Sequence, residues 1–440
     1  MHIAIIGNGI AGITAARHIR KLSDHRITVI SDETEHFYSR TALMYLYMGH
    51  MAYENLKPYE DWFWEKNRIG LLRDYVNQIN TAEKQLILRS GKRLDYDKLL
   101  IASGSKSNRL NVEGADLRGV QTLYGIPDLE LMEEHTRNVQ QAVVVGGGLI
   151  GVEMAEMQLS RKIAVTFLVR EKEFYDLIFP NEEGSMISRE IRRHGVDLRL
   201  ETELAAIEGD EHGRVNAIRT NAGERISCGF VGIAVGVHPN LDVVKNSGIE
   251  TGSGVLADTF LRTSVEDVYA AGDCVELRKP PPGHRAISPV WYTGAIMGRH
   301  VARVICGKKI PYDPGYYFNS AKFFGIEWQV YGHAPRTFEG GDASLFWQHP
   351  NGRQSVRLVY DAETTAITGF NILGQRYRQL VCEDWMTNKK TLKYVVEHLE
   401  ACQFNPEFHE KHNEAIRLNY NKLFPDNPAE KHRRKIFRFF

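Results

Sequence analysis

The chain has 440 residues, of which 43% are hydrophobic and 25% are charged. These proportions are typical of a globular protein, and at about 100–200 residues per domain the length predicts two to four domains. The 55 basic and 55 acidic residues cancel, so the overall charge gives no reason to expect nucleic acid or an acidic substrate as a partner.

Five cysteines are scattered along the chain without a C-x-x-C motif. This pattern fits a reducing cytosol and predicts neither a disulfide framework nor a metal site. The histidines show no spacing typical of metal ligands, and no apolar run approaches the roughly 18 residues that a membrane span needs. The first expected strand begins at His2, which leaves no room for a signal peptide. We therefore expect a cytoplasmic protein without a metal.

The first forty residues predict a βαβ unit. Apolar runs at residues 2–6 and 26–30 flank a helical stretch that ends near Lys21. A G-x-G-x-x-G turn precedes the helix and contains Gly7, Gly9 and Gly12. In such a turn one glycine permits the bend, one lets the backbone approach a pyrophosphate, and one lets helix and strand pack closely. Because free N–H groups at a helix N-terminus favour anions, this stretch predicts a dinucleotide site.

The second strand of this unit ends in two acids that compete for a ribose. Asp32 lies 20 residues after Gly12 (32 − 12), which is the expected reach of a ribose-binding acid. Glu33 is the alternative, and the sequence does not choose between them. Arg40, on the loop that leaves this strand, is expected near the far end of a bound dinucleotide, with a solvated loop as the alternative.

The next segment is expected to be helical first and then to form strands. Residues 41–70 are aromatic-rich and helical in pattern, and short strands follow from residue 73. A buried strand within residues 94–101 then ends in small residues beginning with Ala102. Small residues at a strand end permit the close approach of a ligand or a crossing between domains, and we place the first crossing at residues 105–118.

Residues 142–169 repeat the opening unit. The distance from Gly146 to Val169 is 23 residues, the same as from Gly7 to Ile30. The second turn contains Gly146, Gly148 and Gly151, and Glu171 again lies 20 residues after the third glycine (171 − 151). Two fingerprints with the same internal spacing predict two dinucleotide sites, one for a held cofactor and one for an exchanging one.

The strand end of this second unit is mixed. Arg170 can pair with the 2′-phosphate of NADPH, whereas Glu171 can bond the free 2′-hydroxyl of NADH. We slightly favour NADH because Glu171 is in register with Asp32. A later strand-like run at residues 230–235 ends at Gly236 and mirrors the small strand end of the first unit.

A short buried strand then ends in Gly272 and Asp273. An acid beside a glycine at this position can bond a sugar-like hydroxyl, and the alternative is that Asp273 caps a following helix. Pro289 and Trp291 open a helix that is expected to run to Ile305.

From Tyr312 the composition shifts to a third, sheet-containing domain. Strands are expected at residues 322–331 and 355–360, and helices from about Tyr377. Residues 431–440 are basic and aromatic. They are expected to form a solvated tail, or to dock on an acidic protein or an anionic membrane surface.

Together, the two glycine turns, the paired small strand ends and residues 263–273 resemble the pyridine nucleotide-disulfide oxidoreductase superfamily over residues 1–310. The runs 38–40 and 146–153 look most like NAD(P)H-dependent ferredoxin and rubredoxin reductases and the flavin part of assimilatory nitrite reductase. The resemblance implies an α/β protein with two Rossmann-like domains, for FAD and NAD(P)H, and a C-terminal α+β interface domain. The implied boundaries are residues 1–113 with 251–310 for FAD, 114–250 for NAD(P)H, 311–425 for the interface domain, and 426–440 for the tail.

The resemblance also implies roles for single residues around FAD. The pyrophosphate would lie on Gly7, Gly9 and Gly12, the adenosine ribose on Asp32 or Glu33, the adenine by Val76, the ribityl chain on Asp273, and the flavin ring by Pro289 and Trp291. Arg40, Ala102 and Gly272 complete the expected FAD-binding set.

In the second unit, NAD(P)H would be held by Gly146, Gly148 and Gly151, with Arg170, Glu171 and Gly236. Glu153 would lie near the nicotinamide. Glu153 and Arg40 are the residues expected to take part in catalysis.

One departure from the superfamily bears on the reaction. Disulfide reductases and related peroxidases carry a cysteine beside the flavin in the first domain, and this chain has none before Cys228. A dithiol relay, a coenzyme A disulfide reductase and a cysteine peroxidase are therefore disfavoured. The expected function is an oxidoreductase that passes hydride from NAD(P)H to FAD, and then electrons to a ferredoxin- or rubredoxin-like protein.

Two other functions stay open from the sequence. The tail supports a membrane-surface NADH:quinone oxidoreductase. A non-catalytic redox sensor or interaction protein bearing a flavin, similar in domains to apoptosis-inducing factor, is the other alternative. A homodimer through the C-terminal domain is expected by analogy only.

Overall fold

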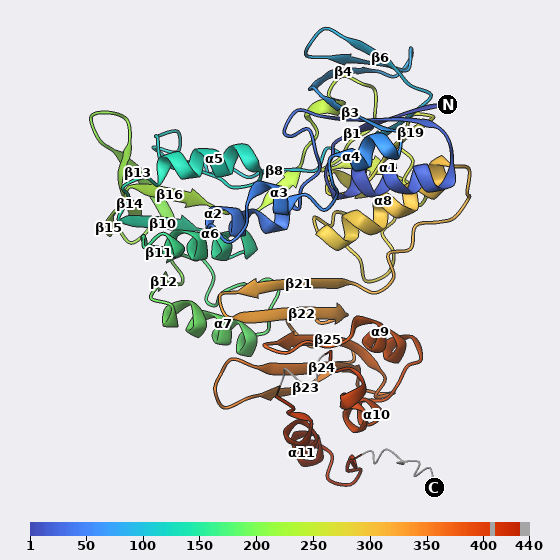
Figure 1. Cartoon of the computed structure of the whole chain (residues 1–440). Helices are drawn as coiled ribbons and strands as arrows, with labels where there is room; N and C mark the ends of the chain where they lie inside the picture. Colours follow the sequence, from blue (N-terminus) through green and yellow to red (C-terminus); the bar gives the residue numbers. More distant parts are fainter. Residues whose placement is uncertain (405–409, 432–440) are drawn as a thin grey trace. The chain divides into compact units, whose positions relative to one another are not determined.

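The computed structural model describes residues 1–404 and 410–431, which form two compact units (Figure 1). Unit 1 contains residues 1–168 and 202–314, and unit 2 contains residues 169–201 together with the chain from residue 315 onward. The basic–aromatic tail lies outside the described residues, apart from Lys431 and the residues before it. None of the helices in the described part of the chain is long and apolar enough to cross a membrane.

The first sheet of unit 1 is parallel and has the order β19-β7-β1-β2-β3. Its strands are β1 (His2–Ile6), β2 (Arg26–Ser31), β3 (Ile69–Arg73), β7 (Lys98–Ile101) and β19 (Val268–Ala270). The strands predicted at residues 2–6 and 26–30 are confirmed. The edge strand β3 was not predicted, because only one of its five residues is buried and its sequence carries no clear alternation.

Two glycine-dependent helices cover this sheet, α1 (Ile10–Leu22) and α8 (Trp291–Ile305). A Cβ on Gly298 of α8 would lie 2.3 Å from the carbonyl oxygen of Ala11, well inside contact distance. One turn earlier, a Cβ on Gly294 would meet only side-chain atoms, of Ile10 at 3.0 Å and of Ala11 at 4.0 Å. The two helices therefore approach until the backbone of Gly298 contacts the backbone of Ala11. This contact places the N-terminal end of α8 beside that of α1.

The second sheet repeats the arrangement of the first. Within unit 1 its strands run β11-β10-β16-β9 and are parallel. They are β9 (Val120–Gln121), β10 (Gln141–Val145), β11 (Ala164–Leu168) and β16 (Phe230–Ile233), with helices α5 (Ile126–His135) and α6 (Leu149–Ser160). Val145 pairs with Leu168 as Ile6 pairs with Ile30. The predicted internal repeat and the α/β fold class are thus confirmed.

The chain crosses between these two folds on two antiparallel strands, β8 (Ser105–Ser107) and β17 (Val237–Pro239). Beside them, Ser103 Oγ donates to the Asn240 carbonyl at 2.8 Å. One strand was expected over residues 94–101, but the structure has β6 (Arg93–Asp95) and β7, separated by two residues.

The remaining elements of unit 1 are short. The helices are α2 (Leu43–Tyr47), α3 (Tyr53–Leu56) and α4 (Trp62–Lys66). The strands are β4 (Val76–Asn80), β5 (Gln85–Leu88), β13 (Leu204–Gly209), β14 (Val215–Thr220), β15 (Arg225–Ser227), β18 (Val255–Ala257) and β20 (Val275–Leu277).

Unit 2 is built on an antiparallel sheet of order β21-β22-β25-β24-β23. The strands are β21 (Phe318–Phe323), β22 (Ile326–Gly332), β23 (Asp342–Gln348), β24 (Ser355–Asp361) and β25 (Ile367–Leu373), and the helices are α7 (Asn181–Arg193), α9 (Gln379–Thr387), α10 (Leu392–Glu397) and α11 (Asn413–Leu423), with β12 (Asp197–Arg199). The single strand expected at residues 322–331 is wrong: the chain turns at Phe324 and Gly325, and Phe324 adopts a φ of 52°.

Buried ion pairs attach α7 to this sheet. Arg357 on β24 forms two bonds with Glu183, of 2.7 and 2.8 Å, and Arg353 bonds Glu190 at 2.8 Å. The α7 segment therefore packs with the C-terminal sheet, although it follows the second dinucleotide strand in sequence. The boundaries expected from sequence stay a prediction, and the compact units differ from them at residues 169–201.

The close packing of α8 on α1 can be tested by adding one methyl group. We expect Gly298→Ala to lower the free energy of unfolding by about 1–3 kcal/mol, because the new Cβ would overlap the Ala11 carbonyl. Gly294→Ala is the matched control in the same helix, since its Cβ would meet side-chain atoms at 3.0 and 4.0 Å and no backbone carbonyl. Thermal unfolding of both variants checks this, and equal midpoints would contradict it.

Candidate functional site

The first glycine turn has the geometry of a pyrophosphate cradle. Gly7 has a φ of +107°, and its Cβ would lie 2.1 Å from the Ala102 carbonyl oxygen. A Cβ on Gly12 would lie 2.1 Å from the Gly7 carbonyl oxygen, whereas a Cβ on Gly9 would meet nothing within 4 Å. Two glycines therefore serve the bend and the packing of α1. The remaining glycine, Gly9, presents bare backbone to open space at the N-terminus of that helix, where anions bind well.

The second turn repeats this geometry. Gly146 has a φ of +115°, and its Cβ would lie 2.3 Å from the Ala234 carbonyl oxygen. Gly151 is closed by the Gly146 carbonyl at 2.1 Å, and Gly148 faces open space. Each turn leads into a helix, α1 or α6, whose N-cap is the middle glycine. Both turns thus have the shape and the free amides to hold a dinucleotide pyrophosphate.

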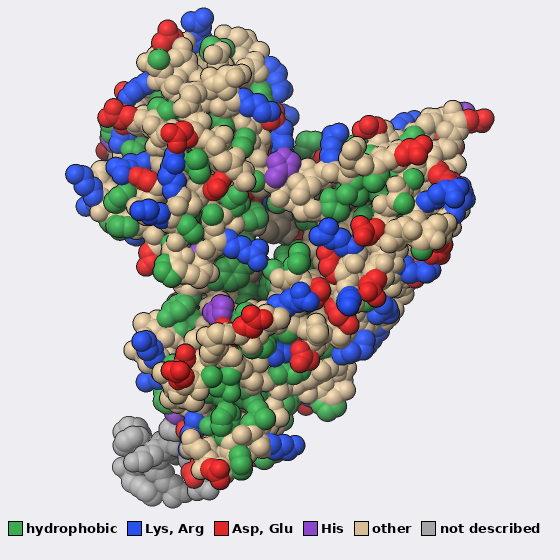
Figure 2. All heavy atoms as spheres, turned by 180° about the vertical axis from the view of Figure 1, so that it is seen from behind, with side chains coloured by type: hydrophobic (Ala, Val, Ile, Leu, Met, Phe, Trp, Pro, Cys, Tyr) green, Lys and Arg blue, Asp and Glu red, His purple; other side chains and the backbone are tan. Residues whose placement is uncertain are grey.

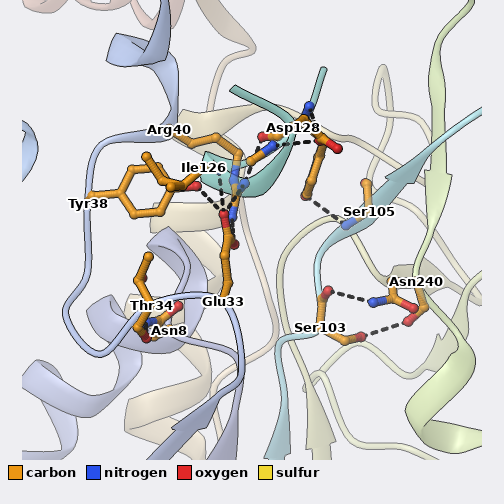
Figure 3. Close-up of polar contacts among 12 residues, drawn as sticks. Asn8, Glu33, Thr34, Tyr38, Arg40, Ser103, Ser105, Ile126, Asp128 and Asn240 are labelled. Atoms are coloured by element: carbon orange, nitrogen blue, oxygen red, sulfur yellow. Dashed lines mark hydrogen bonds and ion pairs between the residues drawn. The ribbon is translucent and has the colours of Figure 1, made fainter. Parts of the chain in front are cut away.

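One side chain missed from sequence fixes the first turn. Asn8, between the first two glycines, is buried, and its Nδ2 donates to the Thr34 carbonyl at 2.8 Å (Figure 3). This bond ties the turn to the loop that leaves β2. An asparagine at the variable position of the motif carries no signal of such a bond.

The two acids after β2 have different surroundings. Asp32 is half-exposed, and its described ion-pair partner is Arg89 at 3.5 Å. Glu33 is mostly buried and accepts hydrogen bonds from Arg40, Tyr38 and the Ile126 amide (Figure 3). The carboxylate of Glu33 is therefore satisfied by the protein, whereas that of Asp32 keeps lone pairs available to a ligand.

A chain of hydrogen bonds leads from this cluster to Asp273. Arg40 Nη1 donates to the Tyr124 carbonyl at 2.7 Å, and the Tyr124 hydroxyl accepts from the Ser105 amide at 2.9 Å. Ser105 Oγ in turn donates to Asp273 at 3.2 Å. Burial raises the pKa of Asp273, against the opposing effects of Ser105 and Arg40. The alternative in which Asp273 caps a helix is wrong, because strand β20 follows it.

The other residues expected around a flavin lie at the same sheet edge or next to it. Ala102 follows β7, and Gly272 follows β19 with its Cβ position 2.8 Å from the Ala11 side chain. Trp291 begins α8, and its ring stacks on Phe37 with centroids 6.0 Å apart. Val76 is buried at the start of β4, and Pro289 is exposed just before α8. The carboxyl edge of a parallel sheet is where open α/β folds bind ligands.

Glu153 on α6 has an unusual carboxyl. It is only partly exposed and, among the described residues, it has no hydrogen-bond or ion-pair partner. Burial, assisted by the nearby Glu156, raises its pKa to about 7. A carboxyl that titrates near neutral pH in a ligand-binding fold is a candidate functional group.

The remaining residues expected around NAD(P)H fall in both units, and Gly236 follows Val235, whose amide nitrogen lies 3.2 Å from the Cβ position of Gly146. Gly236, with a φ of +94°, follows β16 in unit 1, and its Cβ position faces Asn108 at 3.3 Å. Arg170 and Glu171 belong to unit 2, so their distance from the second glycine turn is not described. Within unit 2, Arg170 Nε donates to Glu171 at 2.8 Å.

The five thiols are structural in their surroundings. Four are buried, and the fifth, Cys306, is partly exposed. Burial raises the pKa of all five, which makes them poor nucleophiles.

A possible ligand set that the sequence did not suggest lies in unit 2. His349, Glu410 and His412 place donor atoms within 4.8 Å of one another. The set was missed because 61 positions separate His349 from Glu410 (410 − 349). His349 Nδ1 already accepts a hydrogen bond from the Asn351 amide at 3.1 Å, and we assign no metal to it.

Comparison with known proteins identifies the family. The model of the pyridine nucleotide-disulphide oxidoreductases matches residues 1–302. The chain belongs to this family. It is 31% identical over 287 residues to the biphenyl dioxygenase system ferredoxin–NAD(+) reductase component of Paraburkholderia xenovorans, which covers 65% of the chain and 70% of that protein.

Other members of the family match in different proportions. The chain is 31% identical to a CoA-dependent NAD(P)H sulfur oxidoreductase of Pyrococcus abyssi, over 84% of the chain and 87% of that protein. It is 28% identical to the nitrite reductase [NAD(P)H] of Bacillus subtilis, over 74% of the chain, but it spans only 40% of that longer protein.

Solved structures share the fold. A ferredoxin reductase from Rhodopseudomonas palustris superposes with a TM-score of 0.77 at 24% identity, covering 85% of the chain and 91% of that structure. An NAD-dependent persulfide reductase from A. fulgidus gives 0.83 at 21% identity, over 97% and 84%.

The raised pKa of Glu153 predicts a pH-dependent effect of its replacement. The pKa in the folded protein, about 7, lies above the ordinary 4.5, so the folded state loses stability as pH rises through this range. We expect the free energy of unfolding of Glu153→Gln, relative to that of the wild type, to rise by up to about 3 kcal/mol between about pH 4.5 and 7. Above pH 7 the difference should stay constant. Thermal unfolding of both proteins across this range measures the gain. A difference that does not change with pH would contradict it.

Proposed function

We propose that the chain is an FAD-dependent NAD(P)H oxidoreductase that passes electrons to a protein carrier of the ferredoxin or rubredoxin type. The observation that supports this best is the repeated cradle: two glycine turns of matching geometry within one compact unit. One would hold FAD and the other would hold NAD(P)H.

The residues of the first fold suit FAD. The open face of Gly9 and the amides of α1 would bind the pyrophosphate, and Asp32 would bind the adenosine ribose, since Glu33 is already bonded. Asp273 would hold a hydroxyl of the ribityl chain. Val76 would border the adenine, and Pro289 and Trp291 would border the flavin ring.

When bound, FAD supplies the chemistry: it takes a hydride, which is two electrons and a proton, and releases the electrons one at a time. The protein binds and orients the partners. Gly148 and the amides of α6 would bind the NAD(P)H pyrophosphate. Glu153, with a pKa of about 7, would lie near the nicotinamide as an uncharged carboxyl below neutral pH. Arg40 is fixed by Glu33 and would add positive charge beside Asp273.

A protein carrier as acceptor is supported by the names of several relatives. These include ferredoxin–NAD(+) reductase components and a rubredoxin–NAD(+) reductase of Pseudomonas putida. Other relatives use coenzyme A and sulfur compounds. The absence of any cysteine before Cys228 disfavours thiol chemistry beside the flavin in this chain.

We further propose that NADH is preferred to NADPH. The carboxylate of Glu171 pairs with Arg170 and neutralises its charge, so a 2′-phosphate there would gain little from the arginine and would approach the carboxylate. A free ribose hydroxyl would instead find an acceptor.

Anaerobic titration of the purified, FAD-loaded protein with NADH and then NADPH tests the proposal. We expect the visible flavin absorbance to bleach rapidly with NADH and more slowly with NADPH. Addition of oxidised ferredoxin or rubredoxin should then restore it. A protein that binds no flavin, or whose flavin neither nucleotide reduces, would refute the proposal.

A matched pair of variants tests the assignment of the two cradles. Gly9 and Gly148 have room for a Cβ and lack a positive φ, so both alanine variants should fold. The added methyl would occupy the face that a pyrophosphate approaches. We expect Gly9→Ala to weaken FAD binding about tenfold or more, and Gly148→Ala to retain FAD but weaken NAD(P)H binding similarly. Flavin fluorescence and nucleotide titrations measure each. The opposite pattern would exchange the two sites.

A further inference from the structure

The N-terminal turn of α5 is bonded by a carboxylate from a distant part of the chain. Glu33 Oε1 accepts a hydrogen bond of 3.0 Å from the amide of Ile126, the first residue of α5, which lies 93 residues further along. This amide is one of those that a helix leaves without an internal partner. Asp128 accepts from the two preceding amides, of Tyr124 and Gly125, at 2.7 and 3.1 Å. Glu33 thus caps the first amide of a helix that belongs to the second dinucleotide-binding fold.

Arg40 strengthens the same contact. Its guanidinium bonds both oxygens of Glu33, at 2.7 and 3.2 Å, and also donates to the Tyr124 carbonyl at 2.7 Å. It lies 4.4 Å from the centre of the Tyr124 ring. The loop after β2 therefore presents a matched acid and base, which bond one amide and one carbonyl at the start of α5 (Figure 3).

Gly125 shows how closely the two segments approach. A Cβ there would lie 2.3 Å from Glu33 Oε1 and 2.9 Å from Arg40 Nη1. A side chain at position 125 would overlap Glu33 and Arg40, so the contact requires the glycine that the sequence has there.

The carboxylate stays charged in this position. Burial by itself would raise the pKa of Glu33, but Arg40, Tyr38 and the Ile126 amide outweigh it and hold the pKa below its ordinary value. Removing one member of a buried charged pair leaves the other uncompensated. Separating Glu33 from Arg40 is therefore costly, because each would be left as an uncompensated charge.

We propose that Glu33 is a positioning residue, whose contact with Arg40 and the start of α5 fixes the orientation of the two dinucleotide-binding folds relative to each other. The chain itself joins these folds through β8 and β17 and their flanks. Helix α2 also packs on α5 and α6, where the Tyr47 hydroxyl bonds Thr136 at 2.8 Å and Arg161 donates to the Tyr47 carbonyl at 2.9 Å, so the Glu33 contact acts together with these two bonds. This inference rests on the proposed function. The reaction moves a hydride from NAD(P)H to FAD and leaves NAD(P)⁺, and its rate depends steeply on the separation of the reacting atoms.

Stopped-flow reduction of FAD-loaded Glu33→Gln by NADH tests the proposal. Glutamine keeps the shape and an acceptor for Ile126 but removes the charge that Arg40 needs. We expect the rate constant at saturating NADH to fall about tenfold or more, with a weaker NADH–flavin charge-transfer band. The dissociation constants of FAD and NADH should stay near those of the wild type. If Glu33 only stabilised the fold, the rate constant of the FAD-loaded, folded variant would equal that of the wild type.

A second variant reaches the contact from the other side. Ile126→Pro removes the amide that Glu33 accepts from while leaving the Glu33–Arg40 pair intact, and proline is tolerated at the first helical position. It should lower the same rate constant by a smaller factor. Asp24→Asn is the control, since Asp24 forms an exposed ion pair with Arg68 in the same fold, and it should reduce at the wild-type rate.

The outcomes separate this inference from the proposed function. If neither nucleotide reduces the wild type, the proposed function fails. The orientation is then read from amide exchange alone, which should rise at residues 105–107 and 237–239 in Glu33→Gln. Wild-type rates and wild-type exchange in both Glu33→Gln and Ile126→Pro would overturn the inference. So would loss of FAD affinity in Glu33→Gln matching that in Asp32→Asn, because Glu33 would then be the ribose ligand.

Discussion

Close approach of backbone to backbone is the constraint on which unit 1 depends. Gly7 meets the Ala102 carbonyl, Gly12 meets that of Gly7, and Gly298 meets that of Ala11, each where no Cβ fits. Because of these approaches, strand ends and helix N-termini gather at one edge of the first sheet. Gly146 and Gly151 impose the same geometry on the second sheet. Gly9 and Gly148 face open space and can receive a ligand, because the close contacts of the other glycines hold each turn in shape.

Buried charges then join segments that the chain separates widely. Glu33 connects the loop after β2 to α5, and Glu183 connects α7 to β24 through Arg357. Elsewhere charge is dispersed: acidic and basic side chains are interspersed over the face that Figure 2 presents. The molecule thus places its few buried ions at junctions between elements, where both partners are needed.

The sequence predicted what short-range spacing encodes and missed what distant contacts decide. The strands around both glycine turns and the helix from Trp291 were foreseen, because glycine spacing and apolar runs are local signals. Glu33 could not be distinguished from Asp32, since its decisive partner lies 93 residues away. The turn at Phe324 was missed because Phe323, Phe324 and Ile326 are all apolar, as in a buried strand. The grouping of residues 169–201 with the C-terminal sheet depends on Arg353 and Arg357.

That last grouping limits how the gene for this protein can be cut or recombined. A truncation after residue 314 would remove Arg353 and Arg357, so Glu183 would lose its arginine partner and Glu190 would lose its shortest ion pair and keep only Arg193 and His194, each at 3.6 Å. A chimera that exchanged the C-terminal sheet alone would face the same mismatch. The interchangeable module is therefore discontinuous: residues 169–201 would have to travel with the sheet that follows residue 315, even though the chain visits unit 1 between them.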